Sequence, residues 1–430
     1  MQKIIIYTTT TCPYCVRAKA LLDRKSAIYQ EINAEDPKIR EEMVKKAGGR
    51  KTVPQIFIGD FHVGGCDDLY ELDRQGQLDE KLLSHLMLVT TASPAVANRI
   101  GLTDNYFSSR HIIFLFLAAI IVLFFSSLDK KWIRRFAILG FLVSLSMLVL
   151  VKFYGFEVKG ATRWINVAGF SYQPSEFMKP FFAVVTGWIL SLQYNEEFPS
   201  FKACFFLFVL VAVLLIIQPD FGMLVMVSAV FGIQLFVAGL PIIWIFIAVF
   251  GAISGSISAY LLLPHVAARI NKFLDQVNSE NYQVTKSLEA FESGGLYGKG
   301  PGEGLVKQYL PDSHTDFIFA VAGEEFGAII CIMIVLTFAY IVIRTLVNLL
   351  HEDDKFIQIA SIGIIAQFGL QAVINIGVTL NLLPTKGMTL PFISYGGSST
   401  LAISIAIGML LGLTKRKTSL VKYRSQDVEV

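Results

Sequence analysis

Long apolar runs alternate with short polar turns over most of the chain, and the well-formed runs begin only after residue 105. Nine runs are each long enough, or nearly so, to cross a bilayer as a helix, which takes about 20 residues. A tenth, residues 82–97, is weaker because it is short and contains Ser84, His85 and Pro94. We therefore predict an all-α membrane body of about ten spans. The nine runs are His111–Ser127, Phe136–Phe153, Phe177–Leu192, Ala203–Ile217, Met223–Leu240, Ile242–Leu263, Phe317–Ile343, Phe356–Leu380 and Ser399–Leu413.

The composition divides the chain into two parts. Hydrophobic side chains make up 54% of the sequence and charged ones 17%, and the mean hydropathy is +0.57, which is too apolar for an ordinary soluble protein. Residues 1–85 nevertheless hold 26 of the 71 charged side chains. We predict a soluble domain over residues 1–83 and a membrane domain over residues 84–430. The net charge of +3, without a basic stripe, argues against nucleic-acid binding.

Basic residues in the short loops predict the orientation. Lys130, Lys131, Arg134 and Arg135 lie between two spans, and residues 415–417 follow the last one. Because such clusters stay on the cytoplasmic side, ten spans place both termini in the cytoplasm. Met1 leads directly into a strand pattern, so we expect no signal peptide. The expected location is the cytoplasmic membrane.

The N-terminal domain carries a Cys-X-X-Cys motif between a short β-branched run and a helical pattern. At the start of a helix, backbone N–H groups and the helix dipole favour the thiolate of Cys12, and Cys15 is close enough to close a disulfide. The pair can therefore cycle between dithiol and disulfide. A zinc site would need two further ligands, for which only His62 and Cys66 are near, and we predict no metal.

Three segments of this domain together resemble the glutaredoxins: Cys12–Cys15, Thr52–Ile58 and Gly64–Asp68. The resemblance covers residues 1–83 and implies an α/β thioredoxin-like fold, with Cys12 as nucleophile and Cys15 as resolving thiol. Thr9 departs from the family, which often has a lysine there for a glutathione carboxylate. Cys66 has an alternative role as a small packing residue. The implied glutathione-binding residues are Tyr14, Thr52, Val53, the cis-proline Pro54, Gly65, Cys66 and Asp67.

The membrane body has three long loops on the predicted outer side: residues 155–176, 264–316 and 381–398. Loops of such length are usually functional. Arg163, Arg269 and Lys386 are basic on a side where such residues are scarce, which suggests an anionic ligand. The alternative is that they pair with neighbouring carboxylates.

Two further positions in the body stand out. Asp316 is the last charge before an apolar run, where a half-desolvated carboxylate has the pKa tuning of a general base, or simply marks the water line. Gln218–Gly222 predicts a tight turn or a discontinuous helix, with Asp220 as the cap of the next helix.

Five separated motifs closely resemble the SEDS (shape, elongation, division and sporulation) proteins, from Met87 to Lys417. The segment Pro384–Pro391 is similar to the cell-division FtsW branch. The resemblance implies a ten-span peptidoglycan glycosyltransferase that polymerises lipid II with a class B penicillin-binding transpeptidase and other divisome proteins. The motifs are Arg163–Trp164, Gln173–Glu176, Gln218–Gly222, His314–Phe319 and Pro391–Ser398.

This resemblance assigns roles to individual residues. Asp316 matches the essential aspartate of the family and is the predicted base, while His314 is expected at most to orient its loop. Arg269 and Lys386 would stabilise the departing pyrophosphate, and a divalent cation, Mg or Mn, is an optional helper there. The predicted residues that bind lipid II are Arg163, Trp164, Arg269, Lys386 and Ser394.

Two alternatives remain open at this stage. Ten spans and the carboxylates Glu324 and Glu325 would also suit a flippase for the same lipid-linked precursor. The short first span, where glutaredoxin-like sequence runs almost directly into SEDS-like sequence, would also fit a membrane-anchored glutaredoxin whose transferase half is inactive.

Overall fold

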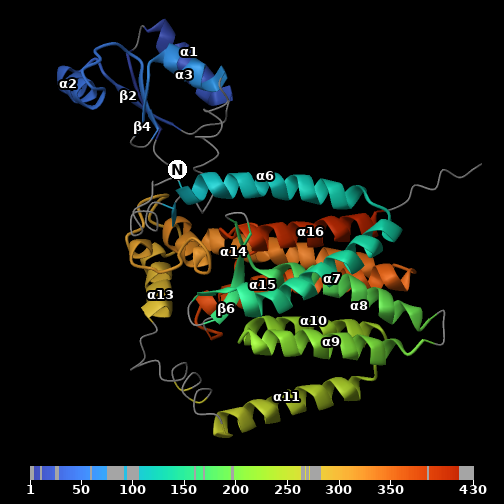
Figure 1. The fold of residues 1–430 in the computed structure, drawn as a ribbon. Helices are drawn as coiled ribbons and strands as arrows, with labels where there is room; N and C mark the ends of the chain where they lie inside the picture. Colours follow the sequence, from blue (N-terminus) through green and yellow to red (C-terminus); the bar gives the residue numbers. More distant parts are fainter. Residues whose placement is uncertain are drawn as a thin grey trace, which may run out of the picture. The chain divides into compact units, whose positions relative to one another are not determined.

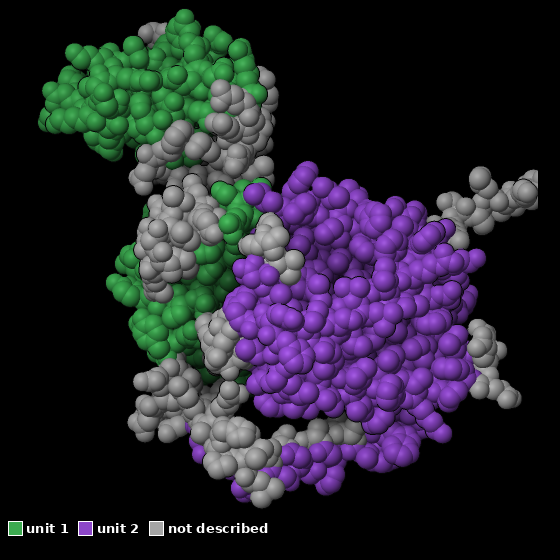
Figure 2. Space-filling model, in the orientation of Figure 1, with its two compact units in different colours: residues 1–112, 280–335, 375–395 green, residues 113–279, 336–374, 396–430 purple. Residues whose placement is uncertain are grey.

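The computed structural model describes residues 4–9, 12–24, 29–58, 61–74, 92–93, 106–158, 161–167, 170–194, 198–262, 267, 271, 282–384 and 387–415. The chain forms two compact units (Figure 2). Unit 1 comprises residues 1–112, 280–335 and 375–395, and unit 2 comprises residues 113–279, 336–374 and 396–430. The predicted first span lies almost wholly outside the described residues, as do Arg269 and Lys386.

The N-terminal part of unit 1 is a four-stranded sheet of order β2-β1-β3-β4 with three helices (Figure 1). β1 pairs with β2 in parallel and with β3 antiparallel, and β3 pairs with β4 antiparallel. The parallel pair requires a crossover, which α1 supplies. The elements are β1 (Ile4–Thr8), α1 (Pro13–Arg24), β2 (Tyr29–Asn33), α2 (Pro37–Lys46), β3 (Gln55–Ile58), β4 (Phe61–Gly64) and α3 (Cys66–Arg74).

Alternation along β1 supplies two separate apolar clusters for this sheet. Ile4 and Ile6 pack with Leu69 and the α1 residues Leu21 and Leu22. The next residue, Tyr7, belongs to a second cluster with Met43 of α2. Successive side chains of a strand point to opposite faces, so the clusters lie on the two sides of the sheet. The predicted thioredoxin-like α/β fold is confirmed.

Each of the nine apolar runs predicted from the sequence forms a helix. Six of the described helices, α6, α7, α9, α14, α15 and α16, are both long and apolar enough to cross a bilayer, and α10 is a shorter apolar helix. The chain is therefore a multi-pass membrane protein, while the total of ten spans stays a prediction. The helices are α6 (Tyr106–Ser127), α7 (Lys130–Tyr154), α8 (Pro174–Leu192), α9 (Ser200–Ile217), α10 (Phe221–Val237), α11 (Ile242–Leu262), α14 (Ile318–Leu349), α15 (Lys355–Thr379) and α16 (Gly397–Thr414).

Helix α8 is the centre of unit 2, where it contacts α7, α9, α10 and α16 (Figure 1). Most of its residues are buried, including the charged Glu176 and Lys179. A helix that is apolar nearly all round is expected in such a central place. Close approach to α15 depends on Gly187, where an added Cβ would come within 2.6 Å of the Ala360 Cα atom.

The breaker between α9 and α10 is a tight turn, as predicted. α9 ends at Ile217 and α10 begins at Phe221. The side chain of Asp220 accepts a hydrogen bond from the Met223 N–H group at 3.4 Å, so Asp220 caps α10 as expected. Gln218 is buried and donates to the Leu148 carbonyl at 2.7 Å, which fixes the turn to α7.

Two segments expected as loops contain regular structure. Residues 155–176 include a three-stranded antiparallel sheet of order β5-β6-β7, with strands Phe156–Val158, Ala161–Val167 and Phe170–Tyr172. The segment 264–316 includes α13 (Tyr282–Gly294) and a 3₁₀ turn, η1 (Val306–Gln308). Two strands of three residues around one of seven, and a single polar helix, carry too weak a periodicity to stand out from a loop.

Helix α14 is interrupted at Gly327, whose φ of 78° and ψ of 178° are not helical. A Cβ at this position would come within 2.3 Å of the Leu296 carbonyl oxygen. Glycine is therefore required both by the positive φ and by the close approach of the segment after α13.

We expect Gly187→Ala to lower the stability of the purified protein in detergent, because the added methyl group overlaps Ala360 and overpacking typically costs about 1–3 kcal/mol. Gly232→Ala in α10 is the matched control, since a Cβ there meets no atom within 4 Å. The midpoint of thermal unfolding of the Gly232→Ala variant should stay the same as that of wild type or rise. Equal midpoints for the two variants would contradict the close packing of α8 and α15.

Candidate active site

Asp316 lies just before α14, half-buried, and faces the segment 387–390 of unit 1. The amide nitrogen of Asn375 donates to the carbonyl oxygen of Asp316 at 2.8 Å and to that of Met388 at 2.6 Å. A Cβ added to Gly387 would stand 3.1 Å from Oδ2 of Asp316. The predicted base is therefore a partly desolvated carboxylate with a fixed main chain, which suits proton transfer at the edge of a membrane.

The two residues before Asp316 are held in the same way. The Ser394 hydroxyl donates to the Thr315 carbonyl at 2.5 Å, and the Tyr395 N–H group donates to the His314 carbonyl at 2.9 Å. Ser394, predicted to bind lipid II, is 1% exposed and also accepts the Leu390 N–H group at 2.8 Å. The structure thus brings Ser394 to the Asp316 loop, where its hydroxyl makes internal hydrogen bonds.

His314 packs in an aromatic group. Its ring centroid lies 4.4 Å from that of Phe107 and 5.6 Å from that of Tyr395. The described part of the chain contains no group of three His, Cys, Asp or Glu residues that could hold a metal ion. The residues present around Asp316 therefore give no set of ligands for the optional divalent cation.

Glu324 and Glu325 are fully buried near the start of α14. Glu324 accepts the N–H groups of Val306 and Lys307 at 2.7 and 2.8 Å, and Glu325 pairs with the Lys307 ammonium group. The carboxylates are thus shielded from lipid, as a membrane position requires. Their hydrogen bonds anchor the turn at η1 to α14 instead of lining a path for a solute.

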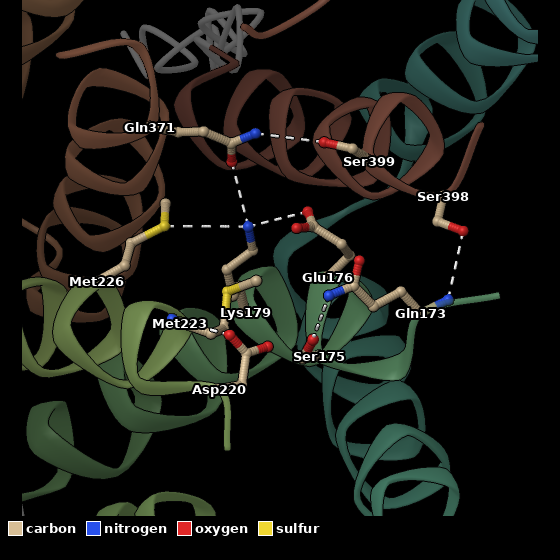
Figure 3. Close-up of polar contacts among 10 residues, drawn as sticks. All are labelled: Gln173, Ser175, Glu176, Lys179, Asp220, Met223, Met226, Gln371, Ser398 and Ser399. Atoms are coloured by element: carbon tan, nitrogen blue, oxygen red, sulfur yellow. Dashed lines mark hydrogen bonds and ion pairs between the residues drawn. The ribbon is translucent and has the colours of Figure 1, made fainter. Parts of the chain in front are cut away.

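A second cluster of polar side chains lies inside unit 2. In it, Lys179 and Glu176 of α8 form an ion pair at 2.9 Å (Figure 3). The ammonium group also donates to Gln371 Oε1 at 3.2 Å and lies 4.0 Å from the sulfur of Met226. Gln371 in turn donates to the Ser399 hydroxyl at 3.2 Å. This network joins α8 to α10, α15 and α16.

Sequence reasoning missed Lys179, although a signal was present. A lysine within an apolar run, three residues after a glutamate, lies on the same face of a helix as that glutamate. The adjoining cavity is only about 10 Å³ and is lined by Phe182, Met226, Val227, Val230, Gln367 and Lys179. That volume suffices for about one water molecule. The ion pair is therefore enclosed in the helix bundle and has no room for a sugar.

Two of the sequence motifs meet at the start of α8 and α16 (Figure 3). The Gln173 N–H group donates to the Ser398 hydroxyl at 3.4 Å, and that hydroxyl donates to the Ser171 carbonyl at 3.0 Å. The Gln173 side chain donates to Ser175 at 3.2 Å. The polar residues of Gln173–Glu176 thus hold the first turn of α16 in place.

Arg163 and Trp164 lie in β6, and both are half-buried. The Arg163 guanidinium donates to the Pro219 carbonyl at 2.6 Å and lies 3.7 Å from Oδ1 of Asp220. This is the alternative arrangement considered from the sequence, in which the arginine pairs with a neighbouring carboxylate. The pair joins the β5-β6-β7 sheet to the turn between α9 and α10.

The dithiol lies at the start of α1, as the sequence predicted. Cys12 Sγ accepts the Cys15 N–H group at 3.2 Å, and the thiol lies 3.6 Å from the Val53 carbonyl oxygen. Cys15 is 1% exposed, and burial raises the pKa of its thiol to about 12. A group that stays protonated at neutral pH is a poor nucleophile, so the arrangement favours Cys12 for attack.

The predicted glutathione-binding residues differ in their surroundings, and only some of them lie beside Cys12. The Val53–Pro54 bond is cis, and Gly65 approaches the Pro54 carbonyl, so these residues and Cys12 lie together. Tyr14 is 53% exposed beside the dithiol. Cys66, by contrast, is buried in the apolar cluster with Leu69, which favours the packing role. Thr52 and Asp67 lie next to Val53 and Cys66 in the chain.

Comparison with known proteins identifies the chain. A family model for cell cycle proteins of the FtsW/RodA/SpoVE type matches residues 79–419, and a glutaredoxin model matches residues 4–63. The chain belongs to the FtsW/RodA/SpoVE family. Both predicted resemblances are thereby confirmed.

Similar proteins agree with this assignment. A probable peptidoglycan glycosyltransferase FtsW of Caulobacter vibrioides is 42% identical over 334 residues, covering 77% of this chain and 86% of the relative. One from Aliivibrio salmonicida is 35% identical over 342 residues, covering 77% and 85%. The FtsW/RodA/SpoVE model begins at residue 79, after the segment 4–63 that the glutaredoxin model matches.

Solved structures of the same kind share the fold. A chain from a study of a peptidoglycan synthase complex that coordinates polymerization and crosslinking aligns with a TM-score of 0.63 at 23% identity, covering 77% of this chain and 97% of that one. The rod shape determining protein RodA of Thermus thermophilus aligns with a TM-score of 0.55 at 24% identity, covering 76% and 94%. The FtsW/RodA/SpoVE fold of the membrane domain is thus confirmed.

In this FtsW/RodA/SpoVE member, we expect Lys179→Met alone to destabilise the protein by about 3–5 kcal/mol, because it leaves the Glu176 carboxylate buried without its cation. The double variant Glu176→Gln, Lys179→Met should recover most of that loss, as measured by a double-mutant cycle of unfolding in detergent.

The control for this cycle is Lys286→Met, which breaks the partly exposed pair of Lys286 and Glu289 at the same spacing of three residues. An exposed pair contributes about 0–1 kcal/mol, so a small effect is expected. A loss for Lys179→Met no larger than that of Lys286→Met would rule out a stabilising buried pair.

Proposed function

We propose that the chain is a peptidoglycan glycosyltransferase that polymerises lipid II at the outer face of the cytoplasmic membrane during septal wall synthesis. The observation that carries the proposal is the fixed, half-buried Asp316 next to the segment 387–390. Relatives of the chain named as probable peptidoglycan glycosyltransferases FtsW support it.

The reaction asks for one proton acceptor and one cationic region. A sugar hydroxyl of the acceptor must lose its proton as it attacks the anomeric carbon of the donor, whose lipid pyrophosphate then departs. Asp316 takes that proton in our proposal. Arg269 and Lys386 offset the developing charge of the pyrophosphate, and Arg163 and Trp164 shape the outer cavity. We route no step through a divalent cation.

The assignment to an enzyme is favoured over a flippase by the charged groups inside the membrane domain. Glu324 and Glu325 bond to Lys307 and to backbone N–H groups, and Glu176 bonds to Lys179. A carrier would need polar groups available to its cargo at several depths. Within the described residues these five charged groups are engaged by one another, by Gln371 or by the backbone.

The proposal includes a second activity in the soluble domain, residues 1–83. The Cys12–Cys15 dithiol reduces disulfides with glutathione as the cofactor, held by the rim around Val53, Pro54 and Gly65. This chemistry belongs in a reducing compartment, so both termini are placed in the cytoplasm and the protein in the inner membrane. A class B penicillin-binding transpeptidase and other divisome proteins are the expected partners.

We expect Asp316→Asn to lower lipid II polymerisation by about 10²-fold or more, because the amide cannot accept the acceptor's proton. The measurement is glycan-strand formation by the purified full-length protein with its cognate transpeptidase. Asp353→Asn is the matched control, since Asp353 is exposed. Polymer formation by the Asp316 variant at the rate of the control would remove Asp316 as the base.

For the soluble domain, Cys12→Ser should abolish reduction of a glutathione mixed disulfide, whereas Cys15→Ser should retain it. The difference follows from the buried Cys15 thiol, whose raised pKa of about 12 keeps it protonated at neutral pH. A coupled glutathione reductase assay on the full-length protein measures both variants. Activity that survives Cys12→Ser and is lost in Cys15→Ser would reverse the assigned roles.

A further inference from the structure

Asn375 joins two segments that are far apart in the sequence. It lies near the end of α15, is 1% exposed, and its side-chain nitrogen reaches the carbonyls of both Asp316 and Met388. Between those segments the chain runs through all of α14 and α15. Local structure therefore cannot set the position of Asp316 against residues 387–390, and a contact through the tertiary fold must do so.

The orientation of the Asn375 amide follows from its neighbours. The NH₂ group has two hydrogens, and each of the two carbonyl oxygens accepts one. The reversed amide would put its own oxygen against both carbonyls. The Oδ1 atom finds no hydrogen-bond partner among the described residues. The side chain of Asn375 is thus held by its two N–H donors. An aspartate at this position would have the same shape but would lack the two donors.

The backbone carbonyls of residues 314, 315 and 316 each accept a hydrogen bond from another segment of the chain, and the bond from Asn375 to Asp316 is the third of these. Those of His314 and Thr315 are taken by Tyr395 and Ser394, which both lie in the segment after residue 387. Asn375 takes the third from a different element, and the same amide nitrogen also bonds to the Met388 carbonyl. Loss of this bond would remove one restraint on the backbone of Asp316, and so on the distance between its carboxylate and Gly387.

We propose that Asn375 is a positioning residue for glycan polymerisation, because its amide sets where the Asp316 carboxylate stands relative to residues 387–390. This inference rests on the proposed function, in which Asp316 accepts the proton of the attacking hydroxyl. A displacement of a reacting group by about 1 Å costs on the order of 10²-fold in rate. The effect falls on turnover, since Asn375 is 1% exposed and its amide bonds to the backbone of the protein.

The experiment compares wild type with Asn375→Asp and Asn375→Ser in the full-length protein with its cognate transpeptidase and purified lipid II. We expect Asn375→Asp to lower kcat by about 10- to 100-fold while KM for lipid II changes by no more than about 2-fold. Asn375→Ser keeps one donor and should fall between the two. Asn348→Asp makes the same exchange at an exposed position and should match wild type.

A second readout separates positioning from general stability. Hydrogen exchange of the amides of Thr315 and Phe317, which both bond to the Asp312 carbonyl, should quicken in Asn375→Asp. Exchange in α16, and the midpoint of thermal unfolding, should stay close to wild type. A merely structural role would instead lower the unfolding midpoint and the amount of folded protein without changing kcat per folded molecule.

The outcomes are distinct. A wild-type protein that makes polymer and an Asn375→Asp variant with wild-type kcat would overturn this inference and leave the proposed function standing. A wild-type protein that makes no polymer would count against the proposed function itself, and the exchange rates of Thr315 and Phe317 would then decide the role of Asn375. If neither variant folds, Asn375 is a stability residue and the inference fails.

Discussion

The cost of placing charge away from water governs the membrane domain. An unpaired ion in an apolar interior loses several kcal/mol of solvation, so each buried charge requires a partner in the protein. In unit 2, Glu176 and Lys179 pair within the central helix α8, and Gln371 extends the contact to other helices. In unit 1, Lys307 pairs with Glu325, and Glu324 binds backbone N–H groups. These pairs fix the segments that carry them.

The same constraint shapes the candidate active site. Asp316 stands where the chain enters α14, so its carboxylate is partly removed from water but not enclosed. Its main chain is held by donors from Asn375, and the preceding carbonyls by Ser394 and Tyr395. A fixed backbone with a half-solvated side chain suits a general base, because the reacting group is placed in advance while protons can still leave to water.

The two proposed activities use separate residues, and the fold positions their reactive groups in different ways. In the soluble domain, Cys12 lies at the helix start, where its Sγ accepts the Cys15 N–H group, while burial raises the pKa of the Cys15 thiol. In the membrane domain, reactivity depends on hydrogen bonds from distant segments that hold the backbone around a single carboxylate. The two thiols come from one local motif, whereas the carboxylate site is held by residues some 60 to 80 positions away in the sequence.

The sequence by itself determined the nine apolar helices, the cap at Asp220 and the dithiol, because each follows from local periodicity or from a short motif. The thioredoxin-like fold of the head followed from the resemblance to glutaredoxins. The sequence also singled out Asp316, Ser394 and Arg163. Only the tertiary structure decided their surroundings: Ser394 braces the Asp316 loop and Arg163 pairs with Asp220. Lys179 joins α8 to α15, and Asn375 joins α15 to the segments that hold Asp316 and Met388. The β5-β6-β7 sheet likewise needed the structure. Hydrogen bonds between residues far apart in the chain leave no periodic pattern in the amino-acid sequence, so the sequence pattern could not have predicted them.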